Sequence, residues 1–223
     1  MVNRNGILKD RQDAGRRLAE LLLQYKNQPD CIVLGLPRGG IVVAYEVAVQ
    51  LNLPLDACIV RKLGVPWQPE LAMGAIATGG VRVLNDDVVR DCGISPAEID
   101  AVATREQHEL TRREQAYRPG QPFPGVAGKT VIVVDDGVAT GATIRAAIQV
   151  IRQQGAARIV IAVGAAPPST VRELEHEADQ VVAVLTPEPF AAIGAWFQDF
   201  EQVSDAEVQQ LLSRKIPARI EEH

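Results

Sequence analysis

Short apolar runs rich in β-branched residues recur along the chain, and between several of them apolar residues return every three or four positions. Runs of the first kind are typical of strands buried on both faces, and spacing of the second kind is typical of amphipathic helices. The expected strands cover residues 31–36, 55–60, 73–77, 130–134, 158–163 and 180–185. This alternation predicts an α/β fold with an open, mainly parallel sheet flanked by helices.

The helical spacing predicts helices at about residues 10–25, 40–50, 95–118, 141–154 and 169–177, and a last helix that begins near Ser204. Two of these helices begin with a capping box. Ser95 is followed by Glu98, and Ser204 by Glu207, so that each side chain can satisfy a backbone N–H of the other residue. These pairs predict where the two helices begin.

The expected helix 95–118 is strongly charged around a thin apolar stripe, so we expect it to pack on one side only. It is either a solvated excursion from the core or a contact in a dimer. A segment rich in proline and glycine follows it at residues 119–125. We therefore expect a core at residues 1–186 that carries this excursion, and a small C-terminal hood and tail at residues 187–223.

Composition narrows the class of protein. Of the 223 residues, 47% are hydrophobic and 23% are charged, which is typical of a soluble protein with one substantial core. The net charge of −5 argues against nucleic acid as a partner. The three cysteines lie far apart without a CxxC pair, and neither a signal peptide nor an apolar run of roughly 20 residues is recognisable. We expect a cytoplasmic protein with no disulfide framework, zinc site or membrane contact.

The most informative segment is 131–143, where an apolar run ends in two aspartates and a turn of small residues that leads into a helix. Gly137 and Gly141 allow the backbone to approach a ligand closely, and the first turn of a helix offers unpaired N–H groups. The hydroxyls of Thr140 and Thr143 add two more donors. This turn therefore predicts a phosphate site.

The two aspartates, Asp135 and Asp136, stand at the end of the same expected strand. Their carboxylates accept hydrogen bonds, which is what the vicinal hydroxyls of a ribose require. One ligand that carries both a ribose and a phosphate would satisfy the aspartates and the turn together.

A second expected strand ends in the sequence Gly-Leu-Pro-Arg-Gly-Gly at residues 35–40 and also leads into a helix. Arg38 can hold phosphoryl oxygens through a fork of donors, while the neighbouring glycines allow backbone amides to reach the same group. This turn predicts a second anion site.

Together the two turns resemble those of the type I phosphoribosyltransferases, and the resemblance extends from about Asp10 to Leu212. It implies that Asp135 and Asp136 hold the ribose 2′ and 3′ hydroxyls of 5-phosphoribosyl 1-diphosphate, and Mg²⁺ directly or through those hydroxyls or water. Residues 139–143 would surround the 5′-phosphate. The loop 36–40 would hold the pyrophosphate, and in this family it often contains a non-proline cis peptide.

A third segment, 61–70, corresponds to the mobile active-site loop of the family, with Arg61 and Lys62 as pyrophosphate contacts. Trp67 in this loop either supports the site or covers the base of the loop. The resemblance thus implies catalytic roles for Asp135, Asp136, Arg38 and Lys62. The implied ligand contacts are Leu36, Pro37, Arg38, Gly39, Gly40, Arg61, Lys62, Asp135, Asp136, Gly137, Val138, Ala139, Thr140, Gly141, Ala142 and Thr143.

Aromatic residues gather near the carboxyl end, where Phe190, Trp196, Phe197 and Phe200 lie within a few positions of each other. In the family, a small variable hood covers the site and chooses the acceptor, and this segment is its counterpart here. The same aromatic residues would also serve simply as a packed anchor for the hood.

The reaction that the resemblance implies is displacement at ribose C1, in which pyrophosphate leaves and a nitrogenous, nucleobase-like acceptor attaches. Family members that use 6-oxopurines usually carry an aspartate at the position of Ala139, so the acceptor stays open. Two alternatives remain beside the transferase: a regulator that binds the phosphoribosyl diphosphate without catalysis, and a hydrolase or phosphorylase of a ribosyl phosphate. A homodimer is the expected assembly.

Overall fold

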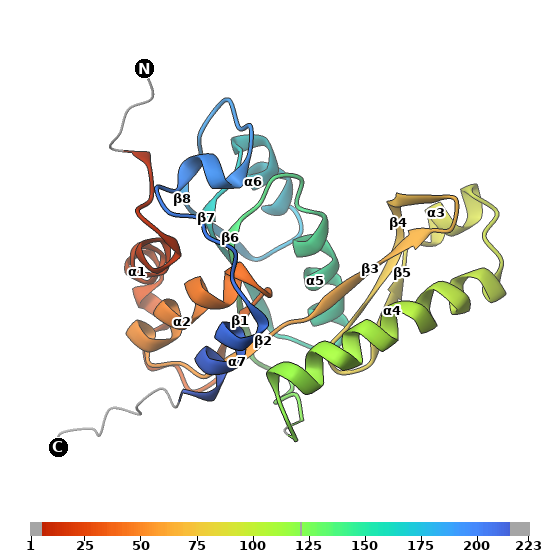
Figure 1. Ribbon diagram of the computed structural model, residues 1–223, viewed down its shortest axis with the longest axis horizontal. Helices are drawn as coiled ribbons and strands as arrows, with labels where there is room; N and C mark the ends of the chain where they lie inside the picture. Colours follow the sequence, from red (N-terminus) through yellow and green to blue (C-terminus); the bar gives the residue numbers. More distant parts are fainter. Residues whose placement is uncertain (1–5, 121, 215–223) are drawn as a thin grey trace.

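A five-stranded parallel sheet forms the centre of the computed structural model, which describes residues 6–120 and 122–214 (Figure 1). Its strand order is β2-β1-β6-β7-β8, and every neighbouring pair is parallel. The strands are β1 (Cys31–Gly35), β2 (Leu55–Ala57), β6 (Thr130–Gly137), β7 (Arg158–Ala165) and β8 (Gln180–Leu185). The prediction of an open parallel sheet flanked by helices is confirmed.

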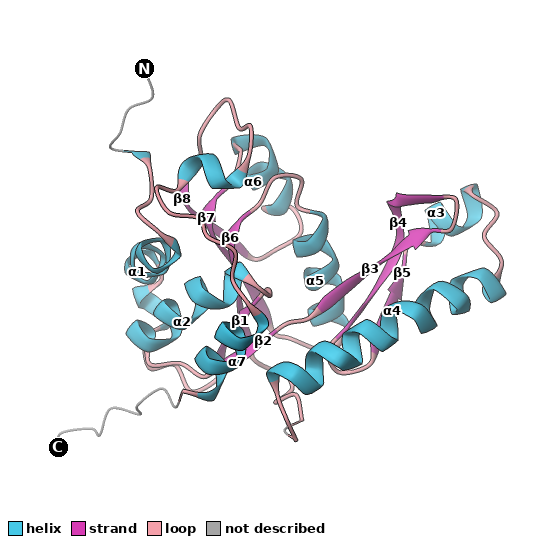
Figure 2. Cartoon of the chain, in the orientation of Figure 1, coloured by secondary structure: helices cyan, strands magenta, loops and turns pink. Residues whose placement is uncertain are grey.

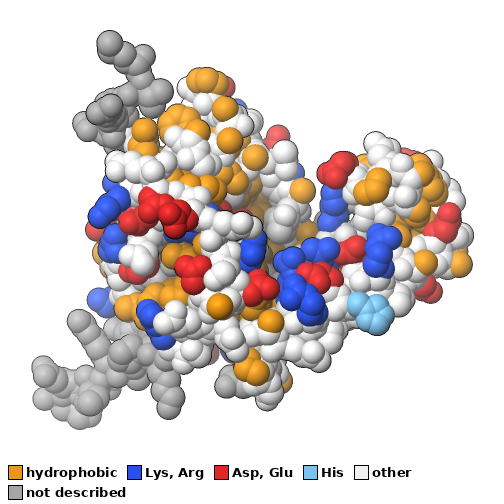
Figure 3. Space-filling model, in the orientation of Figure 1, with side chains coloured by type: hydrophobic (Ala, Val, Ile, Leu, Met, Phe, Trp, Pro, Cys, Tyr) orange, Lys and Arg blue, Asp and Glu red, His pale blue; other side chains and the backbone are white. Residues whose placement is uncertain are grey.

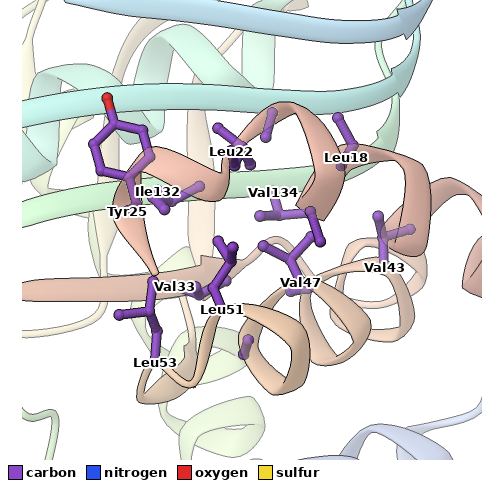
Figure 4. Packing of buried hydrophobic residues seen from close by; sticks show 14 of the residues in the cluster. Leu18, Leu22, Tyr25, Val33, Val43, Val47, Leu51, Leu53, Ile132 and Val134 are labelled. Carbon is purple, nitrogen blue, oxygen red and sulfur yellow. The ribbon is translucent and has the colours of Figure 1, made fainter. Parts of the chain in front are cut away.

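Helices cover both faces of this sheet because its middle strands are apolar on both sides (Figure 2). On one face lie α1 (Arg11–Leu21) and α2 (Gly39–Leu51), with a short 3₁₀ turn at Leu23–Tyr25. On the other face lie α5 (Ala142–Gln153) and α6 (Pro168–Leu174). Figure 4 shows side chains of α1 and α2, among them Leu18 and Val47, packed against Val33, Ile132 and Val134 of the sheet.

A second sheet differs from the prediction. It is antiparallel, with the order β3-β4-β5, and consists of β3 (Val60–Val65), β4 (Gln68–Ala77) and β5 (Val81–Leu84). The expected strand 55–60 is therefore two strands, and the expected strand 73–77 belongs to this sheet and not to the parallel one. The segment 61–70, expected as a loop, contains most of β3, the turn after it and the first three residues of β4. The sequence did not predict β3 and the start of β4 as strands because their residues are only partly buried. Strands with one exposed face carry polar residues there, and such a sequence resembles that of a loop.

Two helices follow the second sheet, α3 (Asp86–Asp91) and α4 (Pro96–Tyr117). We call residues 60–117, which contain this sheet and these helices, the arm. The predicted apolar stripe of α4 is buried at Ile99, Val102, Leu110 and Tyr117, in one cluster with Leu63, Met73 and Ile76 of the second sheet. Acidic and basic side chains lie interspersed over the exposed face of the arm (Figure 3). The helix thus packs on one side only, as predicted.

The arm packs against the core through α5. This helix contacts β3, β4 and β5 on one side and the parallel sheet on the other. A notch separates the tip of the arm from the rest of the surface (Figure 3). No helix within residues 6–120 and 122–214 has the length and apolar character needed to cross a bilayer.

The C-terminal segment contains a 3₁₀ turn at Ile193–Trp196 and the helix α7 (Asp205–Ser213). Both predicted capping boxes are present, Ser95 with Glu98 at α4 and Ser204 with Glu207 at α7. The division at residue 187 into core and hood stays a prediction, and the part of the predicted tail after residue 214 lies outside the described residues.

Candidate active site

The two predicted turns meet because β1 and β6 are neighbours in the parallel sheet. Their register pairs Gly35 with Val134, and the N–H of Leu36 donates to the carbonyl of Val134 at 2.9 Å. The chain leaves β1 toward β2 on one side and leaves β6 toward β7 on the other, so the strand order reverses at this point. Open α/β sheets bind ligands at such a switch point, outside the carboxyl ends of the strands.

The loop 36–40 lies so close to the two aspartates that its glycines, Gly39 and Gly40, leave no room for a larger residue. A Cβ on Gly39 would collide with the carboxylate of Asp136, and a Cβ on Gly40 would come within 2.9 Å of Oδ1 of Asp135. The peptide bond between Pro37 and Arg38 is cis, and α2 begins at Gly39. The structure therefore brings the predicted pyrophosphate loop and the predicted ribose contacts together.

A cavity of about 260 Å³ lies at the turn between β6 and α5, slightly smaller than the roughly 300–1,000 Å³ of small-molecule sites. It is lined by Asp135, Asp136, Gly137, Val138, Ala139, Thr140, Gly141, Ala142, Thr143, Ile144 and Ile193. Gly141 has a φ of 78° and caps the helix, which explains why this position is a glycine. The predicted phosphate turn therefore lines a cavity at a helix N-terminus.

Ile193 reaches this cavity from the C-terminal segment. A Cβ on Gly137 would collide with the Ile193 side chain, so the segment that contains the aromatic cluster lies over the turn. Phe190 stacks on Trp196, and Phe197 packs against Phe200 with ring centroids 4.9 Å apart. These contacts place part of the predicted hood at the site.

The two aspartates differ in their surroundings. Burial raises the pKa of Asp135 well above its usual range, and the charge of Asp136 is the second cause of this rise. The N–H of Asp136, which donates to Oδ1 of Asp135 at 2.9 Å, acts in the opposite direction and lowers the pKa. Asp136 accepts a hydrogen bond at 2.7 Å from Nε of Arg11, and both side chains are nearly buried. The pair therefore combines a carboxyl that resists ionisation with a carboxylate that has a cationic partner.

Arg11 was not recognised from the sequence. It is the first residue of α1, its guanidinium lies 3.8 Å from the ring centroid of Phe200, and its Nη1 donates to the carbonyl of Glu201. It thus joins Asp136 to the C-terminal segment. Since 125 positions separate Arg11 from Asp136, no local pattern in the sequence could have indicated this contact.

Arg61 and Lys62 do not line the cavity at the turn 137–143. Both lie on β3, where Arg61 donates through two nitrogens to Glu106 of α4, and Lys62 pairs with Glu70 of β4 at 3.3 Å. In this arrangement Arg61 joins β3 to α4, whereas the exposed ion pair of Lys62 contributes little to stability. Arg38 by contrast is only half-buried and forms no ion pair with any described residue.

The described residues contain no cluster of three or more His, Cys, Asp and Glu side chains that could hold a metal ion by themselves. Asp135 and Asp136 provide two carboxylates at the cavity. Mg²⁺ is commonly bound by one or two carboxylates together with water and the phosphates of the substrate. The donor set therefore fits Mg²⁺ only as a companion of a bound phosphate.

A carboxylate pair thus lies between two glycine-rich turns at the switch point of a parallel sheet, the place where open α/β proteins bind their ligands. The chain belongs to the family of the phosphoribosyl transferase domain, which it matches over residues 5–194, and its core has the fold of the type I enzymes.

Two proteins from two strains of Mycobacterium tuberculosis, both named "Putative phosphoribosyl transferase", are 49% identical to the chain over 208 residues. The alignment covers 93% of this chain and 47% of theirs, so the chain spans about half the length of these curated relatives. The crystal structure of TT1426 from Thermus thermophilus is similar, with 42% identity and a TM-score of 0.85 over 92% of this chain and 97% of that one.

Proposed function

We propose that the protein uses 5-phosphoribosyl 1-diphosphate and Mg²⁺ to transfer a phosphoribosyl group to a nitrogenous, nucleobase-like acceptor, with release of pyrophosphate. The observation that carries the proposal is the contact between the loop 36–40 and the pair Asp135 and Asp136. It supports a single ligand that has a diphosphate on one side of a ribose and a phosphate on the other. The family assignment supports the same class of ligand.

The turn 137–143 would bind the 5′-phosphate. Its backbone N–H groups stand at the start of α5, and the side chains of Thr140 and Thr143 are exposed beside them. Such a turn favours an anion through its unpaired donors and the positive end of the helix dipole. Asp135 and Asp136 would accept hydrogen bonds from the ribose 2′ and 3′ hydroxyls.

Arg38 would bind the pyrophosphate, because its guanidinium is the cation at the loop 36–40 with no ion-pair partner among the described residues. Lys62 would join it if the arm moved toward the loop. The ion pair of Lys62 is exposed, since 95% of the Glu70 side chain is accessible, so its release would cost little. Arg61 would have to leave a better-packed pair with Glu106.

The chemical step forms a bond between C1 of the ribose and the acceptor nitrogen, while the bond from C1 to the pyrophosphate oxygen breaks. The pyrophosphate leaves with the electron pair, and Mg²⁺, when bound, neutralises part of its charge. Arg38 and Lys62 would stabilise the same developing charge. The acceptor nitrogen gives up a proton, which the departing pyrophosphate or water accepts.

The acceptor, the assembly and the compartment belong to the proposal as well. Ala139 leaves the turn without the carboxylate that serves 6-oxopurines in the family. We propose a homodimer in the cytoplasm, and the three cysteines, all free, fit a reducing compartment.

The first test is calorimetric titration of 5-phosphoribosyl 1-diphosphate with Mg²⁺ into three proteins: the wild type, the double variant Asp135→Asn/Asp136→Asn, and Asp87→Asn. Asp87 is exposed on α3 and controls for the loss of a carboxylate elsewhere. We expect the wild type and Asp87→Asn to bind in the range of about 1 μM to 1 mM that is usual for metabolites. The double variant should not bind while its circular dichroism stays unchanged.

Equal binding by the double variant would refute the site. If the site holds, pyrophosphate release is then measured with a panel of nucleobases and amines. Release that depends on one acceptor would support the transferase, and consumption of the diphosphate without any acceptor would instead favour a hydrolase.

A further inference from the structure

Two side chains outside the cavity hold the backbone of the turn 137–143 from behind. The hydroxyl of Thr170 on α6 donates to the carbonyl of Ala139 at 2.8 Å. Nη1 of Arg145 on α5 donates to the carbonyl of Thr140, also at 2.8 Å. Both side chains also lie close to the next residue, since a Cβ on Gly141 would lie 3.4 Å from each of them.

These bonds determine where the next N–H groups point. A trans peptide unit is planar, and its C=O and N–H point in opposite directions. The carbonyl of Ala139 shares a unit with the N–H of Thr140, and the carbonyl of Thr140 shares one with the N–H of Gly141. When Thr170 and Arg145 hold the two carbonyls, the two N–H groups are turned to the opposite side of the turn.

The N–H groups of Thr140 and Gly141 have no acceptor among residues 6–120 and 122–214. Both residues line the cavity at the start of α5. Two donors are therefore kept fixed in orientation and free for a ligand. A mobile turn loses conformational entropy when a ligand orders it, and this loss lowers the affinity. A turn that is already held in place avoids that cost.

The surroundings of Arg145 make it unsuitable as a ligand contact. Its Nε donates to Glu177 at 2.8 Å and its Nη2 to Glu173, so two carboxylates already oppose its charge. Thr170 is only 5% exposed, and its hydroxyl is used by Ala139. Both residues therefore act on the turn and not on the ligand.

We infer that Thr170 and Arg145 are positioning residues, which hold the peptide units after Ala139 and Thr140 so that their N–H groups are ready to receive a phosphate. The inference rests on the proposed function for the identity of the anion. The orientation of the turn itself does not depend on that function.

The test compares Thr170→Val, which removes the hydroxyl at nearly constant shape, with Thr170→Ser, which keeps it. Titration of ribose 5-phosphate into Thr170→Val should show an affinity loss of about tenfold, the effect of one good hydrogen bond, while Thr170→Ser binds like the wild type. Arg145→Gln should also lose affinity. Arg152→Gln is the matched control, since Arg152 lies on the same helix but pairs with Asp179.

A second measurement needs no ligand. The ¹⁵N order parameters of Thr140 and Gly141 should be near about 0.85 in the wild type and in Thr170→Ser, and should fall below about 0.6 in Thr170→Val. A merely structural role of Thr170 would lower the melting temperature without this local change. Unchanged order parameters in Thr170→Val would overturn the inference, as would wild-type affinity in both Thr170→Val and Arg145→Gln.

The two measurements also separate this inference from the proposed function. If the wild type binds no ribose 5-phosphate, the proposed function fails, while the order parameters still decide whether the two side chains hold the turn.

Discussion

Arg11 is a cation that contributes to the charge balance of the site. Its guanidinium opposes the charge of Asp136 and also lowers the pKa of Asp135, against the larger effects of burial and of the neighbouring carboxylate. A carboxyl with a raised pKa loses its charge at a higher pH. Ligand binding that needs this charge is therefore lost as the pH falls through the raised pKa.

The first prediction concerns the pH dependence of binding in Arg11→Gln. Without the guanidinium the pKa of Asp135 rises further, so the acidic limb of the binding profile should move to higher pH. Affinity near neutral pH should fall severalfold. Calorimetric titration of 5-phosphoribosyl 1-diphosphate across about pH 5–8 measures this, and the ionisation of the ligand itself cancels in the comparison with the wild type.

The control for that profile is Arg17→Gln, which removes an exposed arginine of the same helix that pairs with Asp13. Profiles of identical shape in the wild type and in Arg11→Gln would contradict the role of Arg11.

Gly39 gives the second prediction at this scale. A Cβ there would displace the carboxylate of Asp136 and press on Nε of Arg11, so Gly39→Ala should weaken binding by more than about tenfold through misplacement of the aspartate. Gly6→Ala is the matched control, because a Cβ on Gly6 meets nothing within 4 Å. Equal affinity of the two variants would show that the contact between the loop 36–40 and Asp136 does not matter for binding.

Among the elements, α4 illustrates how local signals in the sequence can fix a boundary. Ser95 accepts from the N–H of Glu98, and the carboxylate of Glu98 accepts from the N–H of Ser95 at 2.9 Å. This reciprocal pair satisfies two backbone donors that the helix itself leaves unpaired. The helix therefore begins where the sequence predicted.

The third prediction is that Ser95→Ala lowers the free energy of unfolding by about 1 kcal/mol, the usual cost of a lost N-cap. Affinity for the phosphoribosyl diphosphate should stay the same, because α4 packs on the second sheet. Urea unfolding measures the change, with Ser213→Ala as control, since Ser213 lies at the end of α7 and caps no helix start. Equal stability of the two variants would contradict the prediction.

The arm shows why other elements could not be predicted. Strand β4 carries a glycine, Gly74, whose Cβ would collide with the backbone of β5 at Val83, and β3 carries Gly64, whose Cβ would collide with Pro69. Glycine at these positions reflects close packing within the sheet, but in the sequence it is typical of a turn. The parallel strands are easier to predict because burial on both faces makes them continuously apolar.

At the scale of the whole molecule, the arm and the core divide the predicted site between them. The turn 137–143 and the loop 36–40 belong to the parallel sheet, whereas Arg61 and Lys62 belong to the arm. Sequence motifs predicted the first two because each lies within a few consecutive residues. They could not predict the ion pairs of Arg61 and Lys62. The pair of Arg61 with Glu106 depends on how α4 packs on the second sheet, and the pair of Lys62 with Glu70 depends on the β3–β4 hairpin.

The fourth prediction separates these two cations. Lys62→Ala should weaken binding of the phosphoribosyl diphosphate and leave the free energy of unfolding unchanged, because its ion pair is exposed. Arg61→Ala should lower that free energy by about 1 kcal/mol, because it removes two hydrogen bonds from β3 to one carboxylate oxygen of Glu106 on α4. Calorimetry measures the affinity of both variants, and urea unfolding measures their free energy of unfolding. Unchanged affinity in Lys62→Ala would show that Lys62 does not contact the ligand.

The pairing of β1 with β6 has a consequence for how the protein folds. Residues 31 and 130 are partners in the sheet, and the whole arm lies between them in the chain. Contacts between such distant segments form slowly, because the entropy of closing a long loop is lost before the contact is gained. The two turns thus exist as a site only after this closure. Recovery of ligand binding during refolding should follow the recovery of helix content, and a nascent chain should acquire its affinity only once β6 has been synthesised.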